Sequence, residues 1–559
     1  VCVTPLSSRA RRKPNTGVIG QMEFDYIVVG GGSAGCVVAG ELAADKNVRV
    51  LVLEVGPAAE DNPETLVAAE YKYAFINEQL MHDRVSVPQA GCAGNRLFMG
   101  SGRGSGGSGS INAMVYTRGD RQDFDEWRCP GWSWDELCPA FTAVEQRLNI
   151  HRLPPTRFTE TCISAAEQAS FARKEDLNDG ALCGYLGYEW MNIAGTARRS
   201  SYVAFLKPLL SVGNVSLLNG AQVEKVVLTG GQATAVQFRH QGEQKTATAR
   251  REIILCAGAL ETPKLLMLSG IGPKAELARH GLPLHVDLPG VGQNLQDHPN
   301  VSLFFKGKQE SDCSWAQLYG FHRVATRSHL QAGQADTCYV FYSARSSFRE
   351  GVIRLLPLMM LPLFLYKVAT LVRLLRALIK AVFSVGLLQR FVARMWGVVV
   401  ILGKPKSRGR LWLQSTDPAQ QAAIDPNYFG DPEDLETLLN GVQRAQQLAA
   451  TEAMQKWGNK ALIPGGGMRS RLAMAKWVRK NVMTTYHYAG TCKMGLEEDP
   501  LAVVDVQLRV RGVRGLRVAD ASVIPSVPVS AMNAPSMVIG YRAAQLVKQA
   551  QQSSEEEAA

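Results

Sequence analysis

The stretch from Asp25 to Glu54 constrains the fold of this chain more than any other part of the sequence. It begins with an apolar run, Tyr26 to Val29, continues through a glycine-rich turn and an amphipathic segment, and ends with a second apolar run, Val48 to Leu53. The turn has the pattern Gly-x-Gly-x-x-Gly, and the acidic Glu54 stands 19 residues after the last glycine. This order of strand, turn, helix and strand predicts a βαβ unit that binds a dinucleotide.

The three glycines of this turn have separate roles in such a unit. Gly30 permits a tight turn, Gly32 lets the backbone approach a pyrophosphate, and Gly35 lets the helix pack closely against the strand. The helix presents its first N–H groups to the phosphates, and Glu54 is placed to accept hydrogen bonds from a ribose. The pattern leaves open whether the dinucleotide is NAD or FAD, and a glycine-rich turn in an ordinary βαβ unit is the alternative interpretation.

Chain length and cysteine pattern limit the class of protein. A chain of 559 residues is too long for one hydrophobic core, so we expect two domains whose segments interleave along the chain. The 11 cysteines are odd in number and contain no Cys-x-x-Cys pair. This pattern predicts free thiols in a reducing compartment and no metal site.

The formal net charge of +11 is concentrated in one segment. Residues 351–416 contain eleven Lys and Arg residues and no acidic residue. No stripe of Lys and Arg interleaved with base-stacking aromatic residues accompanies this excess, so the sequence predicts no nucleic-acid binding.

The first 21 residues form a basic extension. They include Arg9, Arg11, Arg12 and Lys13, several Ser and Thr residues and no acid, and Met22 follows directly before the first predicted strand. This composition is typical of a transit-peptide remnant, so we expect an organelle as the location, with a plastid ahead of a mitochondrion. The alternative is a basic terminus with no targeting role on a cytoplasmic protein.

A second glycine-rich stretch runs from Gly102 to Tyr116, with the sequence GRGSGGSGSINAMVY. So many glycines and serines cannot fill a core, but their backbone amides and hydroxyls can surround a ligand. A flexible linker is the alternative interpretation.

This stretch resembles the first signature of the glucose-methanol-choline (GMC) oxidoreductases, which depend on FAD, in particular their branch similar to choline dehydrogenase and fatty acid photodecarboxylase. Arg118-Gly119 and the run from Asp123 to Trp127 continue the resemblance. The chain departs from the family at Gly104-Ser105, where two apolar residues are usual. Some members carry a histidine that bonds covalently to the flavin at the position of Ile111, so the resemblance implies non-covalent FAD.

Two further stretches resemble the same family. The run from Gly258 to Gly272 fits its second signature, and the run from Pro289 to Pro299 is another hallmark. The latter contains His298, to which the resemblance gives no catalytic role, so we interpret it as a structural histidine. Between the signatures, alternating apolar residues predict the strands Val215–Leu218, Val223–Leu228, Ala233–Gln241 and Glu252–Leu255, and a helix from Ala197 that Pro208 interrupts. The resemblance implies that the backbone of Val223 meets the adenine.

The last quarter of the chain carries the residues implied in catalysis. His487 falls on the catalytic histidine of the family, and Asn533 falls where members carry a second active-site residue, His or Asn. Oxidation of an alcohol removes a hydroxyl proton and a hydride, so a base of near-neutral pKa is required beside the hydride acceptor. We therefore expect His487 to accept the proton and Asn533, at a helix N-terminus, to hold the substrate oxygen. Cys492 is expected only to pack.

The βαβ pattern and the resemblance together predict one set of cofactor-binding residues. Asp520, near the ribityl chain, belongs to the final flavin-binding strand of the family. The full set is Gly30, Gly32, Ser33, Ala34, Gly35, Glu54, Arg103, Gly106, Gly107, Ser108, Ser110, Asn112, Ala113, Val223, Asp520, Ala521, Asn533 and Ala534.

Residues 352–395 form a basic and apolar segment. Their longest uncharged run, Leu355 to Tyr366, has 12 residues, which is shorter than the roughly 20 that a membrane-spanning helix needs. On a helical wheel, Arg373, Arg376 and Lys380 share one face and the leucines lie elsewhere. Two interpretations stay open: a helix lying in a membrane interface, and helices that cover the substrate domain while their cations reach water.

The predicted fold is α/β plus α+β, an FAD-binding Rossmann-like domain with an interleaved antiparallel-sheet substrate domain. We expect Val398–Leu402 to be a strand of the substrate domain, and the run from Lys404 to Leu413 to be a hairpin that crosses it. The expected divisions are the basic extension 1–21, the FAD-binding domain 22–300 with cap insertions near 58–90 and 120–195, the substrate domain 301–480, a return to the FAD-binding domain at 481–551, and a disordered tail 552–559.

The predicted activity is FAD-dependent oxidation of a lipophilic or long-chain primary alcohol, with no residue pattern that identifies the electron acceptor. The first alternative is a light-driven fatty acid photodecarboxylase, a lyase of the same family. Those enzymes replace the active-site histidine and carry a Cys-Arg constellation in the substrate domain, whereas here His487 is present and the corresponding strand reads Ile401-Leu402-Gly403. The second alternative is a membrane-associated flavoprotein without catalysis, which predicts loss of His487 or Asn533.

Overall fold

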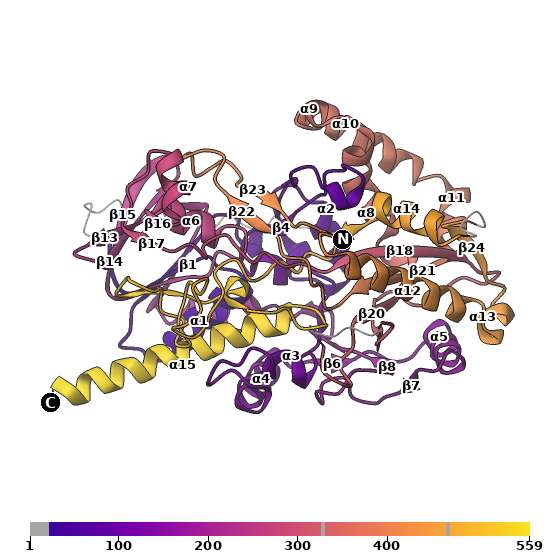
Figure 1. Ribbon diagram of the computed structural model, residues 1–559, viewed down its shortest axis with the longest axis horizontal. Helices are drawn as coiled ribbons and strands as arrows, with labels where there is room; N and C mark the ends of the chain where they lie inside the picture. The colour runs from indigo at the N-terminus through magenta and orange to yellow at the C-terminus, as the bar shows by residue number, and fades with distance from the viewer. Residues whose placement is uncertain (1–21, 326–329, 466–469, 559) are drawn as a thin grey trace, which may run out of the picture.

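The computed structural model describes residues 22–325, 330–465 and 470–558. The basic extension, residues 1–21, and its targeting prediction lie outside these residues. Two large sheets organise the described chain, one in each half of the molecule in Figure 1.

The first sheet holds the predicted βαβ unit at its centre. Its order is β12 (Val215–Asn219), β2 (Val50–Glu54), β1 (Met22–Val29), β15 (Glu243–Leu255), β14 (Gln232–His240) and β13 (Ala221–Thr229), and β26 (Leu516–Val518) also pairs with β15. The pairs β1–β2, β1–β15, β2–β12 and β15–β26 are parallel. Strand β2 is buried throughout and entirely apolar before Glu54, as a central parallel strand covered on both faces must be. Helix α1 (Ser33–Leu42) connects β1 to β2 and packs against α15 (Asn533–Ala558).

The second sheet is the substrate sheet. Its order is β24 (Lys460–Ile463), β18 (Pro299–Lys306), β21 (Met395–Leu402), β20 (Thr337–Ser343), β19 (Leu318–His322), β8 (Tyr185–Tyr188) and β7 (Ala172–Arg173), and β25 (Met483–Thr484) also pairs with β18. The pairs from β18 to β8 are antiparallel. Strands β7 and β8 come from the stretch that the sequence assigned to a cap insertion near 120–195. They join this sheet because β8 pairs directly with β19.

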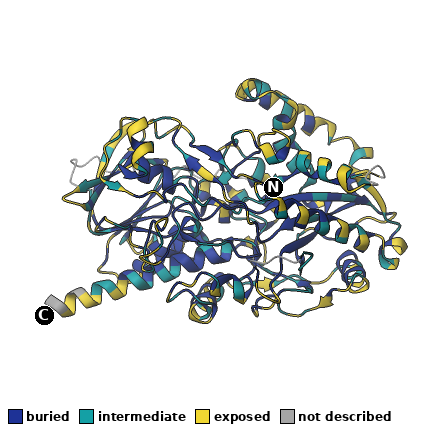
Figure 2. Cartoon of the chain, viewed as in Figure 1, coloured by how far each residue is buried: buried dark blue, intermediate teal, exposed yellow. Residues whose placement is uncertain are grey.

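Helices cover both faces of the substrate sheet. Helix α12 (Pro432–Ala449) contacts β21 and β20, and α8 (Ala344–Met360) contacts the same strands and α2 (Tyr71–Ile76). The basic segment continues from α8 into α9 (Leu363–Tyr366), α10 (Ala369–Val382) and α11 (Gly386–Ala393), which project from the body of the molecule. Figure 2 shows that the strands are largely buried and that these projecting helices are largely exposed.

The remaining elements are short or peripheral. The helices are α3 (Arg121–Asp125), α4 (Trp134–Leu148), α5 (Arg157–Gln168), α6 (Thr262–Leu268), α7 (Lys274–Arg279), α13 (Glu452–Lys456) and α14 (Arg471–Asn481). The strands are β3 (Met81–His82), β4 (Ser101–Gly102), β5 (Val115–Tyr116), β6 (His151–Arg152), β9 (Trp190–Met191), β10 (Ile193–Ala194), β11 (Ala197–Arg198), β16 (Ile271–Gly272), β17 (Val286–Asp287), β22 (Arg410–Trp412) and β23 (Ala423–Asp425). The hairpin predicted within Lys404–Leu413 is wrong in its bounds: that run contains β22, but its antiparallel partner β23 lies beyond it, and the two strands form a sheet of their own rather than part of the substrate sheet.

Two local predictions differ from the structure. The helix expected from Ala197 is reduced to a π-helical turn, Tyr202–Leu206, and a 3₁₀ turn, Lys207–Leu209, because β11 occupies its start and Pro208 prevents continuation. The tail expected to be disordered after residue 551 instead extends α15 to Ala558. Gln551 Nε2 donates to Glu555 Oε1 at 2.6 Å one turn later, and no Gly or Pro ends the helix.

The described residues also show the state of the cysteines and the character of the helices. The cysteines among them are all free. No group of three or more His, Cys, Asp and Glu side chains within them is arranged to hold a metal ion. None of the described helices has the length and apolar character needed to cross a bilayer.

Candidate active site

Residues from both sheets line one cavity of about 1180 Å³. One end is lined by the Gly30 turn, Glu54 and Val223, and the other by apolar side chains of β18, β20, β21 and α8. His487 and Asn533 line the same cavity. The tertiary fold therefore brings the predicted dinucleotide site and the predicted reacting residues into one space.

The glycines of the β1–α1 turn differ in what surrounds them. A Cβ on Gly30 would lie 2.4 Å from the carbonyl oxygen of Cys256, and Gly30 has φ +104°, which L side chains rarely adopt. A Cβ on Gly35 would lie 1.9 Å from the carbonyl oxygen of Gly30. A Cβ on Gly32 would meet no atom of the described residues within 4 Å beyond its chain neighbours, so this backbone faces open cavity. Gly32 is thus the glycine at which a ligand can approach the main chain.

Glu54 is tied to the backbone around it. Its Oε2 accepts from Gly31 N at 2.9 Å, and its Oε1 accepts from the backbone N of Gly56 and of Gly104, both at 2.8 Å. Burial raises the pKa of this carboxyl, and the three N–H groups oppose that rise. Gly104, one of the two departures from the family pattern, therefore helps to hold the predicted ribose-binding residue.

The glycine-rich loop after β4 folds over the β1–α1 turn. A Cβ on Gly107 would lie 2.8 Å from Gly32 Cα, so the two loops are in close contact. The fully buried Arg198 supports this loop by donating to Gly109 O, Asn112 Oδ1 and Asn112 O at 3.1, 2.8 and 2.8 Å. Sequence reasoning missed Arg198, because no motif marks an arginine that binds the backbone of a loop 86 residues earlier.

Most of the predicted cofactor residues line the cavity, and four do not. The lining members are Gly30, Gly32, Ser33, Ala34, Glu54, Arg103, Gly107, Ser108, Asn112, Ala113, Val223, Asp520, Ala521 and Asn533. Gly35, Gly106, Ser110 and Ala534 lie outside its lining. Gly106 N donates to Gly31 O at 2.7 Å and Ser110 Oγ donates to Ser105 O at 2.8 Å, so these two stabilise the loop itself. Gly35 and Ala534 are buried in helix packing.

Asp520 lines the cavity, and its carboxylate accepts hydrogen bonds from three neighbouring groups. Its Oδ2 accepts from Gly258 N at 2.8 Å and from Thr262 Oγ1 at 2.6 Å, and its Oδ1 accepts from Ser522 N at 2.8 Å. Gly258 belongs to the predicted second signature, so this carboxylate links two stretches that lie more than 250 residues apart.

His487 faces a second histidine. The Nδ1 atoms of His487 and His298 lie 2.9 Å apart, so one ring donates and the other accepts. Burial lowers the pKa of His487 to about 4, and burial together with the neighbouring His487 lowers the pKa of His298 well below its usual value. Both rings are therefore neutral at neutral pH. The near-neutral pKa expected for His487 is thus corrected downward, because the ring is removed from water.

The hydrogen bonds of His487 fix its position and leave its ring nitrogen Nε2 available to a substrate. Its backbone N donates to Asp297 Oδ1 at 2.8 Å, and Asp297 also accepts hydrogen bonds from Thr484 Oγ1 and the hydroxyl of Tyr428. Since Nδ1 is engaged by His298, Nε2 is the ring nitrogen left for the cavity, and it has no hydrogen-bond partner among the described residues. His487 can therefore accept a hydrogen bond or a proton at Nε2.

Asn533 is oriented by the first turn of α1. Ser33 Oγ donates to Asn533 Oδ1 at 2.8 Å, although the two residues are 500 positions apart. The amide Nδ2 is then the donor available to an oxygen in the cavity. Asn533 is also the first residue of α15, whose N-terminus carries partial positive charge.

The far end of the cavity is mostly apolar. Its lining includes Phe75, Phe304, Val340, Val352, Leu355, Leu356, Met359 and Ile401. Cys338 also lines it, directly opposite Ile401 in the β20–β21 register. The strand position that the resemblance compares, Ile401-Leu402-Gly403, carries no cysteine, and the thiol in the cavity comes from the neighbouring strand β20. Burial raises the pKa of Cys338 well above its usual value.

The residues present fit FAD. The open main chain at Gly32 and the start of α1 suit a pyrophosphate, and Glu54 and Val223 continue the cavity on one side. Asn112, Asp520 and Asn533 continue it toward His487. These residues would hold the cofactor along the cavity, between the β1–α1 turn and the two reacting side chains.

The chain matches one protein family in two parts. The family model described as GMC oxidoreductase matches residues 24–300 with its N-terminal part and residues 405–540 with its C-terminal part. The oxygen-dependent choline dehydrogenase of Photobacterium profundum is 32% identical over 545 residues, covering 94% of this chain and 93% of that protein. An alcohol dehydrogenase [acceptor] of Pseudomonas putida is 31% identical, covering 94% and 95%.

Solved structures share the fold. Pyridoxine 4-oxidase from Mesorbium loti superposes with a TM-score of 0.79 at 25% identity, covering 94% of this chain and 99% of that one. Formate oxidase from Aspergillus oryzae superposes with a TM-score of 0.81 at 24% identity, covering 96% and 100%. The architecture is the FAD-binding Rossmann-like fold with its antiparallel substrate domain, as predicted. The chain belongs to the GMC oxidoreductase family and is an FAD-dependent oxidoreductase that acts on CH–OH donors.

Proposed function

We propose that this enzyme oxidises a lipophilic, long-chain primary alcohol and that it holds FAD without a covalent bond. The observation that carries the substrate class is the composition of the cavity beyond His487, where aromatic and aliphatic side chains of the substrate sheet and α8 predominate. An alkyl chain gains roughly 0.8 kcal/mol for each CH₂ group that it buries there. A small polar alcohol would leave most of this apolar surface without a partner.

The reacting side chains suit a hydroxyl group. FAD, when bound, supplies the hydride acceptor. His487 Nε2 accepts the hydroxyl proton, and neutrality of the ring before reaction makes this possible. Asn533 Nδ2 donates to the same oxygen, and the N-terminus of α15 stabilises the negative charge that develops on it.

Non-covalent binding is supported by the side chains that face the cavity from the glycine-rich loop. Ile111, at the position where some family members carry the linking histidine, lines the cavity with an aliphatic group. Denaturation of the purified yellow protein in acid should release the flavin into the supernatant. A flavin that stays with the precipitated chain would contradict this part of the proposal.

The substrate class is tested by anaerobic reduction of the bound flavin. Mixed in the dark with alcohols of increasing chain length, the enzyme should bleach fastest with long-chain primary alcohols; choline belongs in the panel because relatives are named for it. His487→Ala should slow bleaching roughly 10²- to 10⁴-fold while the flavin stays bound. The exposed His151→Ala is the matched control and should change nothing. Equal rates with choline and with a long-chain alcohol would contradict the lipophilic assignment.

A photodecarboxylase-like lyase is the second candidate, and Cys338 in the cavity is the observation that favours it. The arginines that line the described cavity, Arg84 and Arg103, lie toward the cofactor end and are engaged with Glu261 and with the carbonyl of Val55. His487 is retained, which favours the alcohol. Release of CO₂ from a fatty acid under blue light, with no bleaching by alcohol in the dark, would replace the first proposal by this one. A flavoprotein without catalysis is disfavoured because His487 and Asn533 are both in the cavity.

A further inference from the structure

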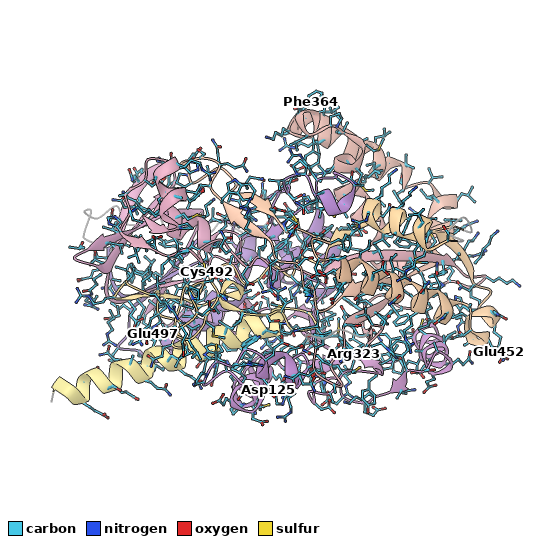
Figure 3. All side chains as sticks on the ribbon, in the orientation of Figure 1. Asp125, Arg323, Phe364, Glu452, Cys492 and Glu497 are labelled. Carbon is cyan, nitrogen blue, oxygen red and sulfur yellow. The ribbon has the colours of Figure 1, made fainter. Side chains whose placement is uncertain are left out.

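Large apolar side chains are exposed mainly on the projecting helices. Ten of the seventeen exposed large hydrophobic residues of the described chain fall between Met359 and Phe391. Figure 3 labels Phe364, at the outer tip of this projection, where it is 70% exposed. The full set is Met359, Met360, Phe364, Val368, Leu374, Leu378, Val382, Val385, Leu387 and Phe391. An apolar concentration of this kind marks an interaction site.

Helix α10 shows how the exposed residues form one face. Val372 and Ile379 are buried against the protein. Leu374, Leu378 and Val382 follow one another at intervals of four residues and are 65%, 62% and 50% exposed. Side chains four residues apart lie on the same face of a helix, so these three form an outward stripe. We call the exposed apolar residues from Met359 to Phe391 the projecting face.

The charges around the projecting face are positive. Residues 352–395 contain seven Lys and Arg residues and no acid. Arg373 and Arg376 pair with Glu78 and with Asp83 of the neighbouring segment. Lys367, Lys380, Arg390 and Arg394 are exposed and form no ion pair within the part of the chain that the structure describes. Exposed cations on the same helices as an exposed apolar face attract an anionic lipid surface.

The same charges argue against a second copy of the chain as the occupant. In a two-fold symmetric dimer this face would meet itself, which would place unpaired cations opposite cations. An anionic bilayer instead offers hydrocarbon to the apolar stripe and phosphate to the cations. The charge pattern therefore selects a membrane.

The cavity reaches the surface beside this face. Met359 lines the cavity together with Leu355 and Leu356 of α8, and it is also 67% exposed and belongs to the projecting face. The opening at Met359 would thus lie at the lipid surface if the face docks there.

We propose that the projecting face docks the enzyme onto an anionic membrane and that the lipophilic alcohol passes from the bilayer into the cavity beside Met359. The docking proposal depends only on the exposed apolar residues of the projecting face and on the Lys and Arg residues of the same helices. The delivery of substrate rests on the proposed function.

Vesicle flotation of the holoenzyme tests the docking. The protein should float with phosphatidylcholine vesicles that contain phosphatidylglycerol, and salt should weaken this binding. The double variant Leu374→Glu, Leu378→Glu should bind at least about tenfold more weakly. The matched control Leu472→Glu changes a leucine that is exposed to a similar degree, 67%, but lies on α14, and should bind like the wild type.

Three outcomes would overturn the docking proposal. They are no flotation of the wild-type protein, equal flotation of the double variant, and equal binding to vesicles of phosphatidylcholine alone. A wild-type dimer that the double variant dissociates, without vesicle binding by either, would assign the face to a second copy.

Flavin reduction separates delivery from chemistry. With a long-chain alcohol embedded in the anionic vesicles, reduction should be slower in the double variant than in the wild type, whereas a short, water-soluble alcohol should reduce both at one rate. Equal rates with the embedded alcohol would overturn the delivery. If neither alcohol reduces the wild-type flavin, the proposed function fails while the flotation result still stands.

Discussion

At the scale of single residues, the chemistry of the active site depends on which side-chain atoms of His487 and Asn533 remain available for hydrogen bonding in the cavity. His298 engages Nδ1 of His487, and Ser33 engages Oδ1 of Asn533. Nε2 of the histidine and Nδ2 of the asparagine are then the groups available in the cavity, one accepting and one donating. This complementary pair is what an alcohol hydroxyl requires.

The pH dependence of flavin reduction should report the environment of His487. Because burial lowers the pKa of this ring to about 4, its neutral form persists down to about pH 5, and kcat/KM should fall only below that. A fall that begins near pH 6.5, the ordinary value for histidine, would show that the ring is hydrated. The same lowered pKa also decreases the free energy of unfolding as the pH falls below 6.5. In that range the unfolded chain binds a proton at His487, whereas the buried ring of the folded chain stays neutral to lower pH.

Replacement of Asn533 should separate orientation from proton transfer. Asn533→Ala removes the donor to the substrate oxygen, so flavin reduction should slow about 10²-fold with the pH profile unchanged. Asn481→Ala, on α14 outside the cavity lining, is the control. If the profile moves with the rate, Asn533 acts through His487 rather than on the substrate.

At the scale of elements, the β1–α1 turn joins strand geometry to cofactor binding. Glycine is required at two positions of this turn for two different reasons. At Gly30 the protein itself leaves no room for a side chain, whereas at Gly32 the room is open to the cavity.

These two glycines give a matched pair of variants. Gly32→Ala should fold with nearly unchanged thermal stability in the apo form but lose FAD, because its methyl group enters only the cavity. Gly30→Ala should destabilise the apo protein itself, since the methyl group meets Cys256 O and the φ of +104° is strained. Apo-protein melting and flavin retention measure the two effects. Retention of FAD by Gly32→Ala would show that the cofactor does not approach this backbone.

At the scale of the whole molecule, a buried ion pair connects the two halves. Lys404 follows β21 of the substrate sheet, and its Nζ lies 2.6 Å from Glu126 Oε1, 3.1 Å from Asp123 Oδ1 and 2.7 Å from Val527 O. Burial alone would lower the pKa of Lys404, but the two carboxylates raise it, so the amine stays charged.

Removal of this lysine should destabilise the assembled protein. Lys404→Met leaves the buried carboxylate of Asp123 and the partly buried one of Glu126 without their cation, which costs about 3 to 5 kcal/mol. Lys406→Met is the control, because Lys406 is solvated and pairs with Asp431 and Glu433 at the surface. Urea denaturation of both variants measures the difference. An unchanged midpoint for Lys404→Met would mean that Asp123 and Glu126 are solvated or protonated.

The sequence by itself determined the parts of this protein that depend on neighbours in the chain. The βαβ unit followed from apolar runs and spaced glycines, the strands β12 to β14 from alternation, and the family from continuous signatures. Each of these patterns reflects local backbone geometry, which a few consecutive residues define.

Only the tertiary structure decided what depends on contacts between distant residues. It placed His298 against His487 across 189 positions, Arg198 beneath the glycine-rich loop and Cys338 opposite Ile401. It also lowered the pKa of His487 and left one face of α10 without cover, because burial depends on the three-dimensional packing of elements far apart in the chain.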